Sequence, residues 1–260
     1  MTRLLSGIVL IGLVLAAVWF APDWLFLAAV IVVLIGAFVE YAGLVSHVGL
    51  DVPRVAGATA AAVVAGTIGL HAPVVPVLAA VTVVCGVVVL GRHVPGPQVP
   101  GSAAATLFPV FYLGLPLGLL AATRVEYGRE AVLFVLAIVI VSDTAQFYVG
   151  SSLGRHRLAP QVSPKKSVEG AIGGLVAGAL VALFFGRVAW PTLGPGWLAG
   201  MGLVMAALGI AGDLSESLLK RSASVKDSSA LIPGHGGILD RIDALLLVIP
   251  GYYVFLYFLH

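Results

Sequence analysis

The chain has 260 residues, of which 60% are hydrophobic and only 10% charged, and its net charge is +2. Soluble proteins carry about 25% charged residues, so this composition excludes a soluble domain and indicates an integral membrane protein. The net charge is too small and too dispersed to indicate a nucleic-acid partner. The one cysteine, Cys85, excludes a disulfide framework and a cysteine-rich metal site.

Apolar runs follow one another along the whole chain. A bilayer core about 30 Å thick requires about 20 apolar residues per helix. The runs are continuous rather than alternating, which predicts spanning helices and not barrel strands. The predicted fold class is therefore all-α, a polytopic membrane protein with about nine transmembrane helices, near residues 4–21, 24–40, 54–71, 73–91, 103–123, 130–150, 169–187, 197–212 and 244–259.

Within these runs, Gly170, Gly174 and Gly178 repeat at one-turn spacing. Small residues at this spacing let helix backbones approach closely, and we expect them to serve packing. Residues 1–22 look like a signal peptide, but further spans follow at once, so we expect the segment to remain as the first span.

The basic residues are distributed unequally between the two sides of the predicted spans. With the N-terminus inside, eleven of the 14 Lys and Arg residues lie on the cytoplasmic side, and only Arg124, Arg129 and Arg187 lie outside. Positive charge is retained in the cytoplasm, so we expect a cytoplasmic N-terminus. The segments predicted to be cytoplasmic are 41–53, 92–102, 151–168 and 213–243.

The segment from Gly212 to Asp243 has five acidic and four basic residues between apolar helices. Asp213, Glu216, Ser217 and Lys220 recur at helical spacing and would share one polar face. Asp240 and Asp243 form a second carboxylate pair at the start of the last span. Carboxylates from two helix ends suit Mg²⁺, which binds through one or two carboxylates, waters and substrate phosphates.

Between these carboxylates lies Pro233-Gly234-His235-Gly236-Gly237. Its backbone N–H groups can approach a phosphate, with His235 as an extra donor. The alternative is that the segment is only a solvated loop whose charges form helix-end salt bridges.

An isolated carboxylate, Asp143, follows the apolar run 139–141 inside the sixth predicted span. Because a charge in lipid costs about 2.5–3.5 kcal/mol on insertion scales, we expect Asp143 to face a polar cavity, together with Gln146 one turn on. The alternative is a packing role with a polar partner.

The other long polar segment runs from Gly150 to Gly170. Arg155, Arg157, Lys165 and Lys166 make it attractive to anions, although the topology rule alone would also place them there. The chain contains no GxxxxGK[ST] phosphate loop and no Gly-x-Ser-x-Gly elbow.

The polar segments together resemble the signature of the phosphatidate cytidylyltransferases, or CDP-diacylglycerol synthases. The resemblance covers residues 142–243. Within it, Phe147, Ser167 and Val168 depart from the usual tyrosine, threonine and aromatic residue. The matching motifs are Ser217-x-x-Lys220-Arg221, Lys226-Asp227, Pro233-x-His235-Gly236-Gly237 and Asp240-Arg241-x-Asp243, with Ser142-Asp143-Thr144, Ser163-Pro164-Lys165-Lys166 and Glu169-Gly170 upstream.

The resemblance implies an enzyme that joins CTP and phosphatidic acid to give CDP-diacylglycerol and pyrophosphate, with Mg²⁺ as cofactor and a second cation as an option. It assigns catalysis to Asp213, Lys220, Asp240 and Asp243, and the metal to Asp213, Asp240, Asp243 and Asp227. It assigns substrate binding to Asp143, Ser163, Lys165, Lys166, Glu169, Ser217, Arg221, Lys226, His235, Gly236, Gly237 and Arg241.

We also expect one integral domain in the inner (cytoplasmic) membrane of the cell, with spans in 1–125 for lipid binding and interfaces and with catalytic spans and cytoplasmic loops in 126–260. Its partners would be CTP, phosphatidic acid and membrane lipids, and a homodimer through transmembrane helices is compatible with it. Two alternatives stay open. One is another CTP-dependent lipid enzyme, a CDP-archaeol synthase or polyprenol kinase. The other is an ion-coupled transporter, which is less favoured because the acidic residues gather at the cytoplasmic ends of the spans.

Overall fold

The computed structural model describes residues 2–229, 231 and 236–259. Apart from one antiparallel hairpin, its described elements are helices, and each predicted span overlaps helix. In chain order the elements are α1 (Thr2–Phe20), α2 (Asp23–His47), α3 (Arg54–Gly69), α4 (Val74–Arg92), α5 (Val99–Pro109), the π-helical turn η1 (Val110–Gly114), α6 (Leu115–Leu153), β1 (Arg157–Ala159), β2 (Ser163–Ser167), α7 (Val168–Ala189), α8 (Pro195–Ser222) and α9 (Leu239–Leu259).

Among the described residues, six helical stretches are long and apolar enough to cross a membrane. They are Asp23–His47, Val74–Arg92, Val99–Leu153, Val168–Ala189, Pro195–Ser222 and Leu239–Leu259. Two further apolar helices, Ile11–Phe20 and Arg54–Gly69, are shorter. The prediction of an all-α, multi-pass membrane protein is thereby confirmed, while the count of nine spans stays a prediction.

One of these stretches, Val99–Leu153, is interrupted by a glycine. Its 55 residues would extend about 80 Å as one straight helix, far beyond a hydrocarbon core about 30 Å thick. The backbone leaves helical geometry at Gly128, where φ is 85° and ψ is 171°. Only glycine adopts such a conformation readily. The break falls between the predicted spans 103–123 and 130–150.

The chain forms two compact units, which are described separately. The first unit comprises Met1–Glu126 and Leu219–Ile242, and the second comprises Tyr127–Leu218 and Asp243–His260.

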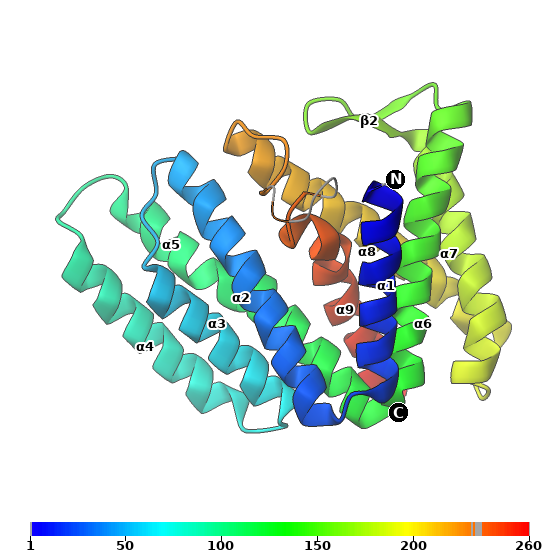
Figure 1. Ribbon diagram of the computed structural model, residues 1–260, viewed down its shortest axis with the longest axis horizontal. Coiled ribbons are helices and arrows are strands. Elements are labelled where there is room, and N and C mark those ends of the chain that lie inside the picture. Colours follow the sequence, from blue (N-terminus) through cyan, green and yellow to red (C-terminus); the bar gives the residue numbers. More distant parts are fainter. Residues whose placement is uncertain (1, 230, 232–235, 260) are drawn as a thin grey trace. The chain divides into compact units, whose positions relative to one another are not determined.

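In the first unit, α3 packs between α2 and α4 (Figure 1). Small residues allow the close approach of α3 to the α5–α6 stretch: a Cβ added to Gly114 would lie 2.7 Å from the Ala61 carbonyl oxygen. Beside this contact, the buried Tyr41 of α2 donates its hydroxyl hydrogen to the carbonyl of Ala105 at 3.0 Å. The N-terminal helices therefore form a packed bundle with few polar side chains inside.

In the second unit, α7 packs through the predicted glycine stripe. A Cβ added to Gly174 would lie 3.0 Å from the Ser142 carbonyl oxygen of α6, and one added to Gly178 would lie 2.8 Å from Ala206 of α8. The expectation that these glycines serve helix packing is confirmed. At the other end of this unit the Trp190 indole donates to the Tyr252 hydroxyl at 3.2 Å.

The polar segment after α6 contains a hairpin that was not predicted from the sequence. Strands β1 and β2 pair antiparallel, with Arg157 opposite Ser167 and Ala159 opposite Ser163. The strands are short, polar and irregular in register, so they lack the alternating pattern by which strands are recognised. Ser167 ends the hairpin and caps α7, because its side chain accepts a hydrogen bond from the Gly170 N–H at 3.1 Å.

Candidate active site

The predicted site residues fall into two groups, one in each unit, and each group is described by itself. The second unit contains Asp143, Ser163, Lys165, Lys166, Glu169, Asp213, Ser217 and Asp243. The first unit contains Lys220, Arg221, Lys226, Asp227, Gly236, Gly237, Asp240 and Arg241. His235 lies outside the described residues.

In the second unit, an ion pair joins the two polar segments. Lys166, on β2, places its ammonium nitrogen 2.5 Å from Oδ2 of Asp213, on α8, and the two side chains are 13% and 26% exposed. Oδ1 of Asp213 accepts a hydrogen bond from the Ser217 hydroxyl at 3.2 Å. The hairpin thus brings a cation to the polar end of α8, so three of the predicted residues lie together.

Asp243 lies beside this group because α8 and α9 touch. A Cβ added to Gly212 would lie 2.6 Å from the Asp243 carbonyl oxygen and 3.0 Å from the Ala244 Cα. The absence of a side chain at Gly212 therefore lets the two helix backbones meet directly before Asp213. Asp213 and Asp243 are therefore carried by adjoining turns of two helices, whereas the predicted pairing of Asp240 with Asp243 in one metal site stays a prediction.

Glu169 stabilises the turn that leads into the hairpin. Its carboxylate accepts hydrogen bonds from the Arg155 N–H at 3.0 Å and from Nδ1 of His156 at 2.6 Å. Nearby, Ser163 is half-buried and Lys165 is exposed. Glu169 has a clear structural task in holding this turn, whereas its predicted contact with substrate stays a prediction.

Asp143 and Gln146 have different environments on α6. Asp143 is exposed, whereas Gln146 is 8% exposed and packs against Gly174. The contribution of Asp143 to the site stays a prediction.

In the first unit, Asp240 is the centre of a buried network. Lys220 places its ammonium nitrogen 2.5 Å from Oδ1, and the two side chains are 11% and 7% exposed. Oδ2 accepts hydrogen bonds from the Ser228 N–H at 3.0 Å, the Ser228 hydroxyl at 2.8 Å and the Gly237 N–H at 2.8 Å. Three donors therefore surround Oδ2, and Lys220 donates to Oδ1.

The two described glycines of the predicted phosphate-binding turn fit closely against this network. Gly236 has φ +81°, and a Cβ added there would lie 2.7 Å from Oδ2 of Asp240. A Cβ added to Gly237 would lie 2.1 Å from the Ser228 hydroxyl oxygen. The sequence predicted that backbone N–H groups here face a phosphate, but the Gly237 N–H donates to Asp240.

The remaining predicted residues of the first unit lie at its surface. Lys226, Asp227 and Arg241 are exposed. Arg221 is also exposed, and its guanidinium donates to the Val225 carbonyl at 3.1 Å. Exposed cations of this kind are suited to attract a polyanionic substrate.

A further carboxylate, Glu40 of α2, was not predicted. It is 7% exposed and accepts hydrogen bonds from both Ser228 and Ser229 side chains, at 2.9 and 2.6 Å. The sequence does contain a signal for it, since Glu40 is an isolated carboxylate beside a long apolar run, as Asp143 is. The predicted span ended at residue 40, but α2 continues to His47 and places Glu40 well inside the helix.

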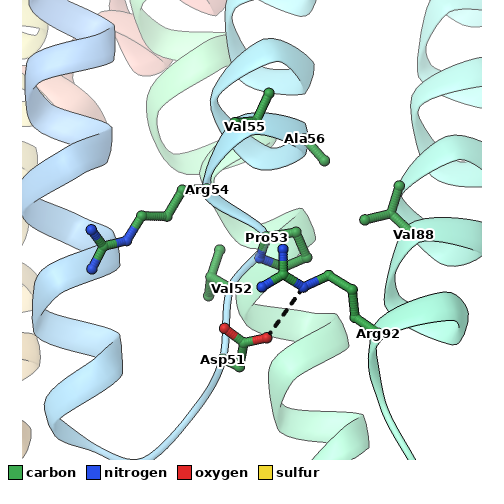
Figure 2. Close-up of a pocket in the computed structure, with 8 residues that line it drawn as sticks. All are labelled: Asp51, Val52, Pro53, Arg54, Val55, Ala56, Val88 and Arg92. Atoms are coloured by element: carbon green, nitrogen blue, oxygen red, sulfur yellow. Dashed lines mark ion pairs between the residues drawn. The ribbon is translucent and has the colours of Figure 1, made fainter.

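Each unit also has a surface hollow. One, of about 460 Å³ in the first unit, is lined mainly by apolar residues and by Asp51, Arg54 and Arg92. Figure 2 shows Arg92 reaching toward Asp51, with 3.5 Å between Nε and Oδ2. The other, of about 470 Å³ in the second unit, is an apolar groove between α6 and α7 that has Glu169 among its lining residues.

The fit of Mg²⁺ is judged from the donor atoms. Within the described part of the chain, no three His, Cys, Asp or Glu side chains lie close enough together to hold a metal ion. Asp213 and Asp243 nevertheless supply hard oxygen donors from adjoining helix turns, and Mg²⁺ requires only one or two carboxylates when waters and phosphates complete its shell. At Asp240, Oδ2 faces three donors of the chain, and Oδ1 faces the Lys220 ammonium group.

Comparison with known proteins gives one family and several relatives. The cytidylyltransferase family model matches residues 1–259. The chain is similar to the phosphatidate cytidylyltransferase of Bacillus subtilis, with 42% identity over 134 residues, 52% of this chain and 48% of the relative. It is also similar to the phosphatidate cytidylyltransferases of Haemophilus influenzae, with 40% identity over 161 residues (60% and 56%), and Staphylococcus aureus, with 39% identity over 148 residues (57% and 56%). The chain spans about half the length of the curated relatives it matches.

Proposed function

The chain belongs to the cytidylyltransferase family, and we propose that it is a phosphatidate cytidylyltransferase, which transfers CMP from CTP to phosphatidic acid. The observation that carries the proposal is the family match over residues 1–259. The names of relatives near 40% identity support phosphatidic acid as the acceptor.

In the proposed reaction, a phosphate oxygen of phosphatidic acid attacks the α-phosphorus of CTP. The bond between the α-phosphorus and the bridging oxygen of the β-phosphate breaks, and pyrophosphate leaves with that electron pair. The second ionisation of a phosphate monoester has a pKa of about 6, so the nucleophile needs no strong general base. The residues therefore act mainly by positioning and charge stabilisation.

The basic and the acidic residues would have different tasks in this reaction. Lys166 and Lys220, with the exposed Arg221, Lys226 and Arg241, would neutralise the negative charge of the triphosphate and the lipid phosphate. Asp213 and Asp243 would hold Mg²⁺, with Asp227 and Asp240 as the further predicted ligands. Bound there, the ion would stabilise charge on the phosphate oxygens as the pyrophosphate leaves.

The proposal includes the orientation of the chain in the bacterial inner membrane. The eleven-to-three bias of Lys and Arg supports nine spans, a cytoplasmic N-terminus, and cytoplasmic segments 151–168 and 213–243. CTP is a cytoplasmic nucleotide, so the reacting residues of these segments would meet it on that side.

The decisive assay compares the position of a radiolabel in CTP. Purified protein in lipid vesicles is given either α- or γ-labelled CTP, Mg²⁺ and one acceptor: phosphatidic acid, a diether phosphate lipid or a polyprenol. We expect the α-label, and not the γ-label, to enter the lipid product with phosphatidic acid, together with release of pyrophosphate. Transfer of the γ-label would instead indicate a kinase, preference for the diether lipid would indicate an archaeol-type synthase, and no transfer would contradict the enzyme proposal.

A further inference from the structure

A clamp around Glu40 ties helix α2 to the start of α9. Oε1 of Glu40 accepts hydrogen bonds from the Ser229 hydroxyl at 2.6 Å and from the Ile238 N–H at 2.9 Å. Oε2 accepts from the Ser228 hydroxyl at 2.9 Å and from the Leu239 N–H at 2.8 Å. We call Glu40 and these four donors the Glu40 clamp; all of it lies within the first unit.

The Glu40 clamp caps the N-terminus of α9, although Glu40 is distant from α9 along the chain. The first N–H groups of a helix have no partner inside the helix, and negative charge is favourable at that end. Glu40 accepts from the N–H groups of Ile238 and Leu239, where α9 begins, although almost two hundred residues separate them along the chain. The start of α9, and Asp240 directly after it, are therefore fixed by a carboxylate of α2.

The clamp shares an atom with the Asp240 network. The Ser228 hydroxyl oxygen lies 2.9 Å from Oε2 of Glu40 and 2.8 Å from Oδ2 of Asp240. A serine hydroxyl has one hydrogen, so it donates to one of the two carboxylates at a time. A change at Glu40 therefore alters the donor set of Asp240, and through Asp240 it alters the position of Lys220.

The shape of α2 fits the same segment. A Cβ added to Gly36, one turn before Glu40, would lie 2.3 Å from Cδ1 of Ile238, so the Ile238 side chain packs directly against the backbone of α2 at Gly36. A Cβ added to Gly237 would lie 2.3 Å from Oε2 of Glu40. The side chain of Ile238 therefore packs against α2 at Gly36, and its N–H donates to Glu40 of the same helix. Together these two contacts hold the start of α9 against α2.

From these contacts we infer that Glu40 is a positioning residue for the cytidylyltransferase reaction. It acts through Asp240 and Lys220, which the proposed function places at the substrates, and it does not itself contact substrate. The inference rests on that proposed function. The inference predicts that Glu40 affects the turnover rate, although α2 contains no residue of the recognised motifs.

The test compares two substitutions at adjacent positions of α2. Glu40→Gln keeps the size of the side chain but turns an amide NH₂ toward donors, whereas Tyr41→Phe removes a buried hydrogen bond to Ala105 that does not involve the clamp. We expect Glu40→Gln to lower kcat by about tenfold to a hundredfold while the KM for CTP changes by about threefold or less. Tyr41→Phe should leave both constants near their wild-type values, even where its Tm falls.

A second readout does not depend on activity. Amide hydrogen exchange at Ile238 or Leu239 should become faster in Glu40→Gln and stay slow in Tyr41→Phe, because only the first change replaces one of their two acceptor oxygens by an NH₂ group. Wild-type kcat and wild-type exchange in Glu40→Gln would overturn the inference. So would equal losses of kcat in both variants, since these would indicate a general effect of weaker packing. An inactive wild-type protein would instead overturn the proposed function, while the exchange experiment would still test the clamp.

Discussion

Two lysine–aspartate pairs, one in each unit, have equal lengths and different surroundings. Lys166–Asp213 in the second unit and Lys220–Asp240 in the first are each 2.5 Å apart. Asp240 is 7% exposed and lies within hydrogen-bond distance of three further donors, whereas Asp213 is 26% exposed and, among the described residues, accepts one further hydrogen bond, from Ser217. A more exposed carboxylate with fewer donors of its own chain is more accessible to a new ligand. The comparison favours Asp213 as the ligand-contacting residue and Asp240 as the residue that organises its segment.

The largest expected effect is the loss of turnover when either aspartate is substituted, and the two substitutions should differ in their effect on stability. Asp213→Asn and Asp240→Asn should both abolish turnover at saturating Mg²⁺. Only Asp240→Asn should also lower the Tm clearly, because its amide NH₂ would face the Ser228 and Gly237 donors and leave buried groups unsatisfied. Turnover and thermal unfolding of the purified variants provide the measurements. Wild-type turnover in Asp213→Asn would remove it from the site, and equal Tm values for the two variants would contradict the comparison.

The next effect concerns the lysines of the same two pairs. Removing one partner of a fully buried ion pair costs about 3–5 kcal/mol, and the cost falls as a partner becomes more exposed, as Asp213 is relative to Asp240. Lys220→Met should therefore lower the free energy of unfolding much more than Lys166→Met. Adding Asp240→Asn to Lys220→Met should restore part of the loss, because it removes the unpaired buried charge. Denaturant unfolding in detergent measures these free energies. Equal losses for the two lysine variants would contradict the expected difference between the two ion pairs.

Hydropathy predicted the helices because membrane helices must satisfy their backbone internally and cover it with apolar side chains. It did not predict the β1–β2 hairpin, whose polar strands lack a periodic signal. The site was predicted as a set of residue types, and the Lys166–Asp213 contact does join the two predicted segments. The partners themselves depend on tertiary contacts that spacing cannot provide. Glu40 was missed because the predicted span ended where α2 in fact continues to His47.

The smallest expected effect concerns Asp143, and it tests whether the candidate site that contains Asp213 also includes this residue of α6. Asp143 belongs to the same unit as Asp213 and is exposed. If Asp143 contacts CTP or a bound cation, Asp143→Asn should lower kcat/KM for CTP by about tenfold or more, because a hydrogen bond to a charged group contributes about 1.5–3 kcal/mol.

Thr144→Val provides the matched control for this variant. Thr144 is the exposed neighbour of Asp143, and its hydroxyl donates only to the Ile140 carbonyl of its own helix among the contacts described, at 2.7 Å. We expect this variant to keep the wild-type kcat/KM. If Asp143→Asn lowers the Tm while CTP kinetics stay unchanged, its role is structural. In that case the second unit would contribute to the reaction through Lys166, Asp213 and Asp243, and Asp143 of α6 would not belong to the site.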